Sequence, residues 1–331
     1  MQRRQCLAAA AALAAAPFVN VRAAEKQKLL VYTAVEPEWL AVYRDAFAAE
    51  RPDIEITYVR ASAGPISARL LAEKDRVQAD AVLGVSAIAM DNLRLKGVLE
   101  PYRPKDANLL SPKMVEKDGH WFGINAWGGS LCVNTDLLRK KGLPMPRSWS
   151  DLLREEFRGQ IVMPSPRASS TGLMFMHGFV QGLGEERGWD VIERLNRNML
   201  FYASSGARPA AMAAQGEIAV GLSSAAFLKP FLKYRTPVQV VEPEEGIAWD
   251  AEACALPRGC PHPEAAKAFL AFCAGPAVGK IAADFSGIAA RKGFSTPEGE
   301  KIAASFLAMD FARAAADKEG ILKRWHAMAS R

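Results

Sequence analysis

Motifs that carry catalytic chemistry are missing from this sequence of 331 residues. It has no G-x-S-x-G nucleophile elbow, no H-E-x-x-H zinc motif and no G-x-x-x-x-G-K-[ST] phosphate loop. Only four histidines occur, scattered along the chain, and no Cys/His spacing is typical of a zinc site. We therefore expect a protein that is not an enzyme and that needs neither a cofactor nor a resident metal.

Long apolar runs are scarce as well, and the one at the start of the chain is short. Residues 7–18 are apolar, follow Arg3 and Arg4, and precede Val21-Arg22-Ala23, which has small or apolar residues at −3 and −1. This pattern predicts a signal peptide over residues 1–23. No later stretch approaches the roughly 18 apolar residues of a membrane span. We expect a soluble mature protein in the periplasm.

The positive charge of the chain is partly a property of that segment. The formal net charge is +6 and the pI about 9.1, values that invite a nucleic-acid hypothesis. The segment 1–23 holds three arginines and no acidic residue, so its removal lowers the charge to +3. The one compact basic run, Arg139-Lys140-Lys141, precedes Gly142 and is typical of a helix C-terminus. No nucleic-acid partner is expected.

Cysteines are few, and their pairing stays open at this point. Four remain after the signal segment, namely Cys132, Cys254, Cys260 and Cys273. Cys254 and Cys260 are near enough in sequence to close a small loop. Cys132 and Cys273 lie in apolar runs and are typical of buried thiols.

The first half of the chain alternates buried-strand and amphipathic-helix patterns. Strands are predicted near 29–33, 54–59 and 79–84, and helices near 37–50, 65–73 and 87–95. This βαβαβα order predicts a parallel sheet with helices on both faces.

A second α/β series follows, between two strands that cross from one lobe to the other. The crossings are predicted at 121–133 and 246–256, the second series has strands near 160–163, 200–202 and 218–222, and the helices of the C-terminal quarter are predicted near 263–273, 297–308 and 310–328. The predicted fold is α/β with two lobes and a ligand in the cleft between them. The expected division is 1–23 signal peptide, 24–126 first lobe, 127–248 second lobe, 249–285 return to the first lobe, and 286–331 C-terminal helices of unassigned lobe.

Three short Ser/Thr/Gly elements precede predicted helices. They read Ser62-Ala63-Gly64, Ser169-Ser170-Thr171 and Ser204-Ser205-Gly206. Helix N-termini present free N–H groups and a partial positive charge, and hydroxyls add donors. Three of them at one cleft would hold an anion without a metal. Ordinary N-capping is the competing interpretation of each.

Four further side chains are candidates for the same cleft. Arg208 could pair with an anion, whereas Glu36 and Asp250 end predicted strands and could face a cation on the ligand. Trp127 could cover an ammonium or alkyl group. Each also has a structural interpretation: a solvated arginine, a helix-start carboxylate, a hinge residue and hinge packing.

Several runs resemble bacterial extracellular solute-binding proteins of ABC importers, and most of all their 2-aminoethylphosphonate-binding members. The resemblance rests on Pro146–Leu152 followed by Phe157–Ile161, and on Tyr32–Glu36, Leu70–Lys74, Gly159–Pro164, Ser169–Gly172 and Gly246–Ala253. It covers nearly the whole mature chain. It implies a type II periplasmic-binding fold, a permease and an ATPase as partners, and an aminoalkyl phosphonate as ligand. A monomer is expected.

The predicted ligand contacts combine the helix starts with the positions that the resemblance matches. They are Thr33, Glu36, Ser62, Ala63, Gly64, Trp127, Ser169, Ser170, Thr171, Ser205, Gly206, Arg208, Ser223 and Asp250. Two departures leave a related phosphonate, a phosphate ester or another small anion open. Ala61-Ser62-Ala63 stands where the family usually has Asp-Ser-Thr, and Ser224-Ala225-Ala226 where it tends to have a Glu and an aromatic residue.

Two other functions compete. Ferric binding would need several oxygen ligands, and the six tyrosines include no adjacent pair. A periplasmic phosphate-ester hydrolase would need a nucleophile with its base, or a metal site, and no such set is visible.

Overall fold

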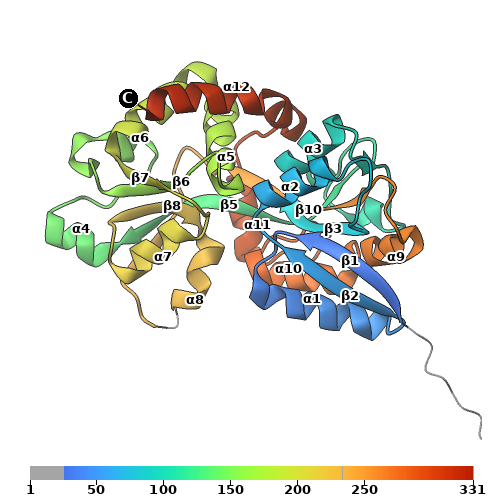
Figure 1. Ribbon diagram of the computed structural model, residues 1–331. Helices are drawn as coiled ribbons and strands as arrows, with labels where there is room; N and C mark the ends of the chain where they lie inside the picture. The colour runs from blue at the N-terminus through green and yellow to red at the C-terminus, as the bar shows by residue number, and fades with distance from the viewer. Residues whose placement is uncertain (1–25, 233, 331) are drawn as a thin grey trace, which may run out of the picture.

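The computed structural model describes residues 26–232 and 234–330 (Figure 1). The predicted signal peptide lies outside these residues. Figure 1 shows two α/β lobes side by side, with the red helix α12 (Phe311–Ala329) running across the top of both. The predicted fold class is confirmed.

The first lobe is built on the predicted βαβαβα unit. Strand β1 pairs in parallel with β2 on one side and β3 on the other. Helix α1 begins at Pro37, where the fixed φ of proline suits a first turn, and buries Tyr43 and Phe47 against the sheet. The elements are β1 (Gln27–Thr33), α1 (Pro37–Glu50), β2 (Ile54–Arg60), α2 (Ala63–Ala72), β3 (Ala81–Ser86), α3 (Ala87–Leu95) and the short β4 (Leu99–Glu100).

The second lobe repeats this logic around β6, which pairs in parallel with β7 and β8. The basic run ends α4 as predicted, because Gly142 takes the left-handed conformation (φ 65°) that closes the helix. The elements are α4 (Thr135–Lys141), β6 (Ile161–Pro164), α5 (Ser170–His177), α6 (Glu185–Asn198), β7 (Met199–Ala203), α7 (Arg208–Gln215), β8 (Val220–Ser224), α8 (Lys229–Leu232) and β9 (Val238–Val241).

Two strands join the lobes. The long strand β5 (Phe122–Asn134) pairs with β10 (Trp249–Pro257) along its first half and with β8 and β9 along its second half. The sheet therefore runs without a break in the order β2-β1-β3-β10-β5-β8-β6-β7. Both predicted crossings exist. The second begins at Trp249 instead of Gly246, because Ile247 pairs with the C-terminal segment at Phe306.

The C-terminal quarter contains α9 (Pro263–Cys273), α10 (Pro276–Ser286), α11 (Pro297–Ala304) and α12. Helix α10 was not predicted. Helix α11 ends at Ala304 and not at Ala308, because residues 305–307 turn back to hydrogen-bond with Ile247. Helix α12 contacts α3 of the first lobe and both α5 and α6 of the second, so it belongs to neither lobe alone.

Cysteine pairing and membrane-span length can be read from the same residues. Cys132, Cys254, Cys260 and Cys273 are all free thiols, so the loop that Cys254 and Cys260 could have closed is not bridged. Cys132 and Cys273 are buried, as predicted. In the described part of the chain no single helix has the length and apolar character of a membrane span. The bent pair α9–α10 meets that test only jointly.

Candidate ligand-binding cleft

A cleft of about 280 Å³ lies between the lobes, at the ends of strands from both. That volume is near the lower end of ligand pockets, which hold roughly 300–1,000 Å³, and suits a small molecule. Its lining residues are Ala34, Glu36, Arg60, Ser62, Ala63, Gly84, Ser86, Trp127, Ala168, Ser169, Ser170, Thr171, Ser205, Gly206, Ala207, Ser224, Ala226, Phe227, Glu252 and Phe285.

The start of α5 forms one part of the wall. Ser169 is the N-cap residue, yet its side chain makes no capping hydrogen bond, and Ser170 and Thr171 follow in the first turn. All three line the cleft. The Ser169 side chain therefore does not cap the helix in the usual way. Its hydroxyl stays available to a ligand, beside the free N–H groups of the helix start.

The loop before α7 lies against this helix start. A Cβ on Gly206 would come within 2.2 Å of Thr171 Oγ1, so only glycine allows the two segments to approach this closely. The buried Ser223 hydroxyl donates to the Gly206 carbonyl at 2.6 Å and fixes the loop. Ser205 and Gly206 line the cleft, whereas Ser223 holds them from behind.

The start of α2 faces the same cleft from the first lobe. Ser62 is its N-cap residue, again without a side-chain capping bond, and both Ser62 and Ala63 line the cleft. Gly64, also predicted, is not among the lining residues. Thr33 is fully buried, and its Oγ1 accepts from the Val35 N–H at 3.1 Å, so it shapes the loop after β1 without lining the cleft.

Glu36 lines the cleft but is already paired. Its carboxylate lies 2.6 Å from Arg60 Nη2, and Arg60 also donates to the Val35 carbonyl. Burial raises the pKa of Glu36 above its usual value, and the Arg60 charge partly opposes this. Arg60 lies 24 positions along the chain and was missed from the sequence, since nothing local links it to Glu36.

Asp250 is buried behind the cleft and does not line it. It accepts from the Ser86 hydroxyl at 2.5 Å and from the backbone N–H of Ala87 at 3.0 Å and of Ala251 at 2.7 Å. These bonds tie β10 to the start of α3. Burial raises its pKa to about 7, although the same bonds favour the charged form. The structure therefore supports the structural interpretation of Asp250.

Glu252, two residues further along β10, is a cleft residue that the sequence reasoning missed. Asn125 Nδ2 donates to its carboxylate at 2.8 Å. Burial raises the pKa of Glu252 to about 7, the Asn125 bond opposes this, and the charges of Glu36 and Asp250 add to the rise. The available signal was its two-residue spacing from Asp250, which places both side chains on one face of the strand.

The mouth of the cleft widens into a second, more apolar hollow of about 730 Å³. Arg208 lines this hollow and not the inner cleft, and it is exposed. Trp127 lines the inner cleft. Trp249 packs instead on Phe306, with ring centroids 4.9 Å apart, and donates to the Leu307 carbonyl, so its role is hinge packing.

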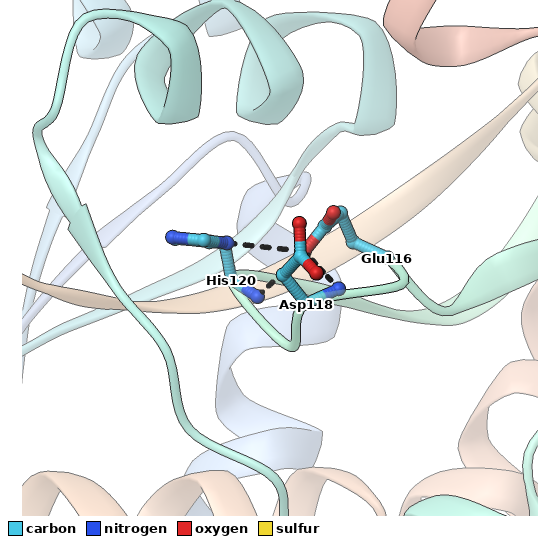
Figure 2. Close-up of side chains that lie close together, drawn as sticks. All are labelled: Glu116, Asp118 and His120. Carbon is cyan, nitrogen blue, oxygen red and sulfur yellow. Dashed lines mark hydrogen bonds and ion pairs between the residues drawn. The ribbon is translucent and has the colours of Figure 1, made fainter.

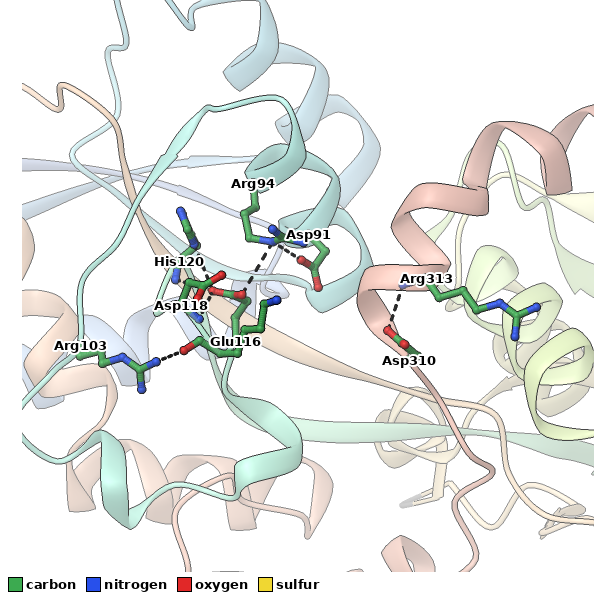
Figure 3. Close-up of polar contacts among 9 residues, drawn as sticks. Asp91, Arg94, Arg103, Glu116, Asp118, His120, Asp310 and Arg313 are labelled. Carbon is green, nitrogen blue, oxygen red and sulfur yellow. Dashed lines mark hydrogen bonds and ion pairs between the residues drawn. The ribbon is translucent and has the colours of Figure 1, made fainter.

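One group of potential metal ligands lies outside the cleft, at Glu116, Asp118 and His120 (Figure 2). Glu116 Oε2 already accepts from the backbone N–H groups of Asp118 and His120 and contacts His120 Nδ1 at 3.1 Å. Burial alone would raise the pKa of Glu116, but these bonds lower it overall. The Arg94 guanidinium lies 3.9 Å away (Figure 3). In this group the Glu116 carboxylate closes a turn through hydrogen bonds and lies beside the positive charge of Arg94.

Two carboxylates, Glu36 and Glu252, are the potential iron ligands that line the cleft. No tyrosine, histidine or cysteine is among the described residues that line it. Tyr32 and Tyr43 are buried in the first lobe, and the Tyr32 hydroxyl donates to Glu73. His177 is buried in the second lobe, where burial lowers its pKa to about 4, as a core histidine requires.

The family follows from the sequence itself. The model of the family described as bacterial extracellular solute-binding protein matches residues 79–315, which is well over half of the chain. The chain belongs to this family. By its family the chain is a bacterial extracellular solute-binding protein.

Individual relatives agree with this placement. A Haemophilus influenzae protein of uncharacterized function is 28% identical over 78% of this chain and 76% of its own length. The probable ABC transporter periplasmic-binding protein y4fP of Sinorhizobium fredii is 28% identical over 69% of this chain and 65% of its own. The solved structure of AfuA from Actinobacillus pleuropneumoniae, with fructose-6-phosphate bound, superposes with a TM-score of 0.85 at 22% identity, covering 92% of this chain and 99% of that one. It shows that the fold is that of a periplasmic binding protein.

Proposed function

We propose that the protein captures a small organophosphonate, with 2-aminoethylphosphonate as the leading candidate, and delivers it to a membrane permease and its ATPase. The observation that carries this proposal is the convergence of three helix starts on one small cleft. At α2 and α5 the N-cap serines make no side-chain capping bond. N–H groups and uncommitted hydroxyls are the donors that a phosphonate head needs.

The charges of the cleft favour an anion held by donors over one held by a cation. Arg60 is paired with Glu36, and Arg208 lies at the outer hollow. The helix starts supply the positive potential through their dipoles, each equivalent to roughly half a charge. Lobe closure over the ligand would exclude water and strengthen these bonds.

Calorimetry on the purified protein tests the proposal. The panel is 2-aminoethylphosphonate, alkylphosphonates, phosphate monoesters including fructose-6-phosphate, inorganic phosphate and Fe(III). We expect 2-aminoethylphosphonate to bind at micromolar or tighter affinity. Binding of iron together with silence toward every phosphonate would overturn the proposal, and binding of phosphate esters alone would move the ligand class to esters.

The variant Ser170→Ala tests whether the Ser170 hydroxyl binds the anion or has only a packing role. Removing one hydrogen bond to a charged group costs about 1.5–3 kcal/mol, or roughly 10- to 100-fold in affinity. The melting temperature should stay close to that of the wild type. Ser330→Ala, which removes a hydroxyl bonded only near the end of α12, is the matched control and should bind normally. Unchanged affinity in Ser170→Ala would show that this hydroxyl does not reach the ligand.

A further inference from the structure

Three carboxylates lie on the first-lobe side of the cleft, and two of them are committed. Asp250 accepts three hydrogen bonds from Ser86, Ala87 and Ala251. Glu36 forms a 2.6 Å ion pair with Arg60. Asp250 has hydrogen bonds to both of its oxygens, and the charge of Glu36 is already balanced by the Arg60 guanidinium. The remaining carboxylate is Glu252.

Glu252 is only partly satisfied where it stands. It lies in β10, opposite Ser86 of β3 and Asn125 of β5, and its side chain lines the cleft. The one donor to its carboxylate in the described part of the chain is Asn125 Nδ2, at Oε2. Within the described ranges no lysine or arginine forms an ion pair with it. The register of β10 shifts immediately after Glu252, as at the β-bulges that often re-aim side chains beside binding sites.

The groups that face Glu252 are acidic or neutral. Glu36, after β1, and Asp250, on β10, both disfavour its charged form, and the buried Tyr43 of α1, within electrostatic reach of Glu252, is a neutral phenol. The Arg60 charge is the nearest countercharge to Glu36. A cation brought by the ligand would relieve this repulsion and stabilise the Glu252 carboxylate.

We propose that Glu252 forms a cation subsite, which selects ligands that carry a primary ammonium group next to the phospho-anion. The proposal rests on the function proposed above and names its substrate class, a zwitterionic aminoalkyl phosphonate. A single carboxylate beside an amide suits an organic ammonium, because Ca²⁺ and Mg²⁺ require six or more oxygen ligands. The anion lies against the helix starts of the second lobe and the ammonium against Glu252.

Matched ligand pairs test the subsite. Calorimetry is run on the wild type, Glu252→Gln and Glu38→Gln with 2-aminoethylphosphonate against ethylphosphonate, and with phosphoethanolamine against ethyl phosphate. Within each pair the ligands differ only by the ammonium group. Glu38 is exposed and does not line the inner cleft, so Glu38→Gln controls for the loss of one negative charge.

We expect the wild type and Glu38→Gln to prefer the ammonium ligand of a pair by about tenfold or more, as for a charge-assisted hydrogen bond. Glu252→Gln should lose this preference while keeping its affinity for the ligand without the ammonium. Since the carboxylate is the binding form and its pKa is about 7 in the free protein, the wild-type preference should rise about tenfold from pH 6 to pH 8. The phospho-group of a given ligand titrates equally with the wild type and with Glu252→Gln. The difference between these two proteins in the pH dependence of the preference therefore reports the ionisation of Glu252.

Other outcomes would overturn one proposal or both. Equal binding within each pair by the wild type, or a preference that survives in Glu252→Gln, overturns the cation subsite. A wild-type affinity for the ligand without the ammonium that falls as pH rises, relative to that of Glu252→Gln, shows instead a protonated Glu252 donating to the anion and overturns the subsite. Binding of the phosphate-ester pair alone, with the ammonium preference intact, overturns the phosphonate and leaves the subsite standing. Silence toward both pairs overturns both proposals.

Discussion

The two walls of the cleft use opposite chemistry. The second-lobe wall presents hydrogen-bond donors, namely the start of α5 and the loop before α7, and none of its inner lining residues carries a formal charge. The first-lobe wall carries the acidic groups Glu36 and Glu252, and Arg60 is the one cation among the described residues that line the inner cleft. The helix-start donors of this wall lie at the start of α2. A ligand with separate positive and negative ends therefore has one favourable orientation.

The contrast also explains why composition is a poor guide to this site. The donors of the second-lobe wall are backbone N–H groups and serine hydroxyls, which contribute nothing to net charge. They cost little to desolvate compared with lysine or arginine, and they are fixed by the fold before a ligand arrives.

The largest effect is expected from disrupting the hydrogen-bond donors on the second-lobe wall. Gly206→Val should lower anion affinity by about 100-fold or more, because the new side chain collides with Thr171 and displaces two segments, costing at least two hydrogen bonds of about 1.5–3 kcal/mol each. Calorimetry measures the affinity, and circular dichroism checks the fold. Gly64→Ala is the comparison, since a Cβ there meets nothing within 4 Å, and should change affinity less than about twofold.

The next effect separates the two carboxylates of β10. Asp250→Ala leaves a buried hydroxyl and two backbone N–H groups without their acceptor, so it should lower the free energy of unfolding by about 3 kcal/mol. Glu252→Ala leaves only the Asn125 amide without its acceptor and should lower the free energy of unfolding by about 1 kcal/mol. Urea denaturation measures both values. Equal losses would contradict the division into one structural and one ligand-facing carboxylate.

The smallest expected effect concerns a bond between the walls at the mouth of the cleft. Lys229 of α8 donates to the Asp284 carbonyl at 2.7 Å and to the Phe285 carbonyl, both at the end of α10 in the first lobe. Lys229→Met should speed ligand release about two- to fivefold, since an exposed bond contributes only about 0.5–1 kcal/mol. Stopped-flow fluorescence measures the rate. Lys280→Met, elsewhere on α10, should leave it unchanged.

Local patterns in the sequence predicted the elements well where their ends are marked by residues with strong preferences. Helices α1 and α9 begin at Pro37 and Pro263 as expected, and their apolar periodicity set their lengths. Helix α10 was missed although Pro276 marks its start. Only a short break after Cys273 separates it from α9, and the apolar run after this break was predicted as irregular chain.

The candidate site was predictable only in part, and the reason is physical. Ser62, Ser169 and Gly206 were found because helix starts have a local signature. Glu252 and Arg60 were missed because their positions depend on which strands neighbour each other in the sheet, and on a register shift, neither of which a local pattern encodes. Asp250 was expected at the ligand for the same reason: its partner Ser86 lies 164 residues away.

Helix α12 places a mechanical limit on the hinge. Phe311 and Ala314 are embedded in the core of the first lobe, whereas Ile321 and Trp325 are embedded in that of the second. Gly320 lies between these two pairs of residues and is exposed, so that a Cβ added there would meet nothing within 4 Å. If one lobe rotates against the other, this 19-residue helix must bend, or its apolar side chains must leave the core of one lobe. Exposing one large apolar side chain to water costs about 1.5–3 kcal/mol. Because glycine is the most conformationally permissive residue, we expect α12 to bend at Gly320 when the lobes rotate, and the stiffness of the helix there to limit how far the cleft opens.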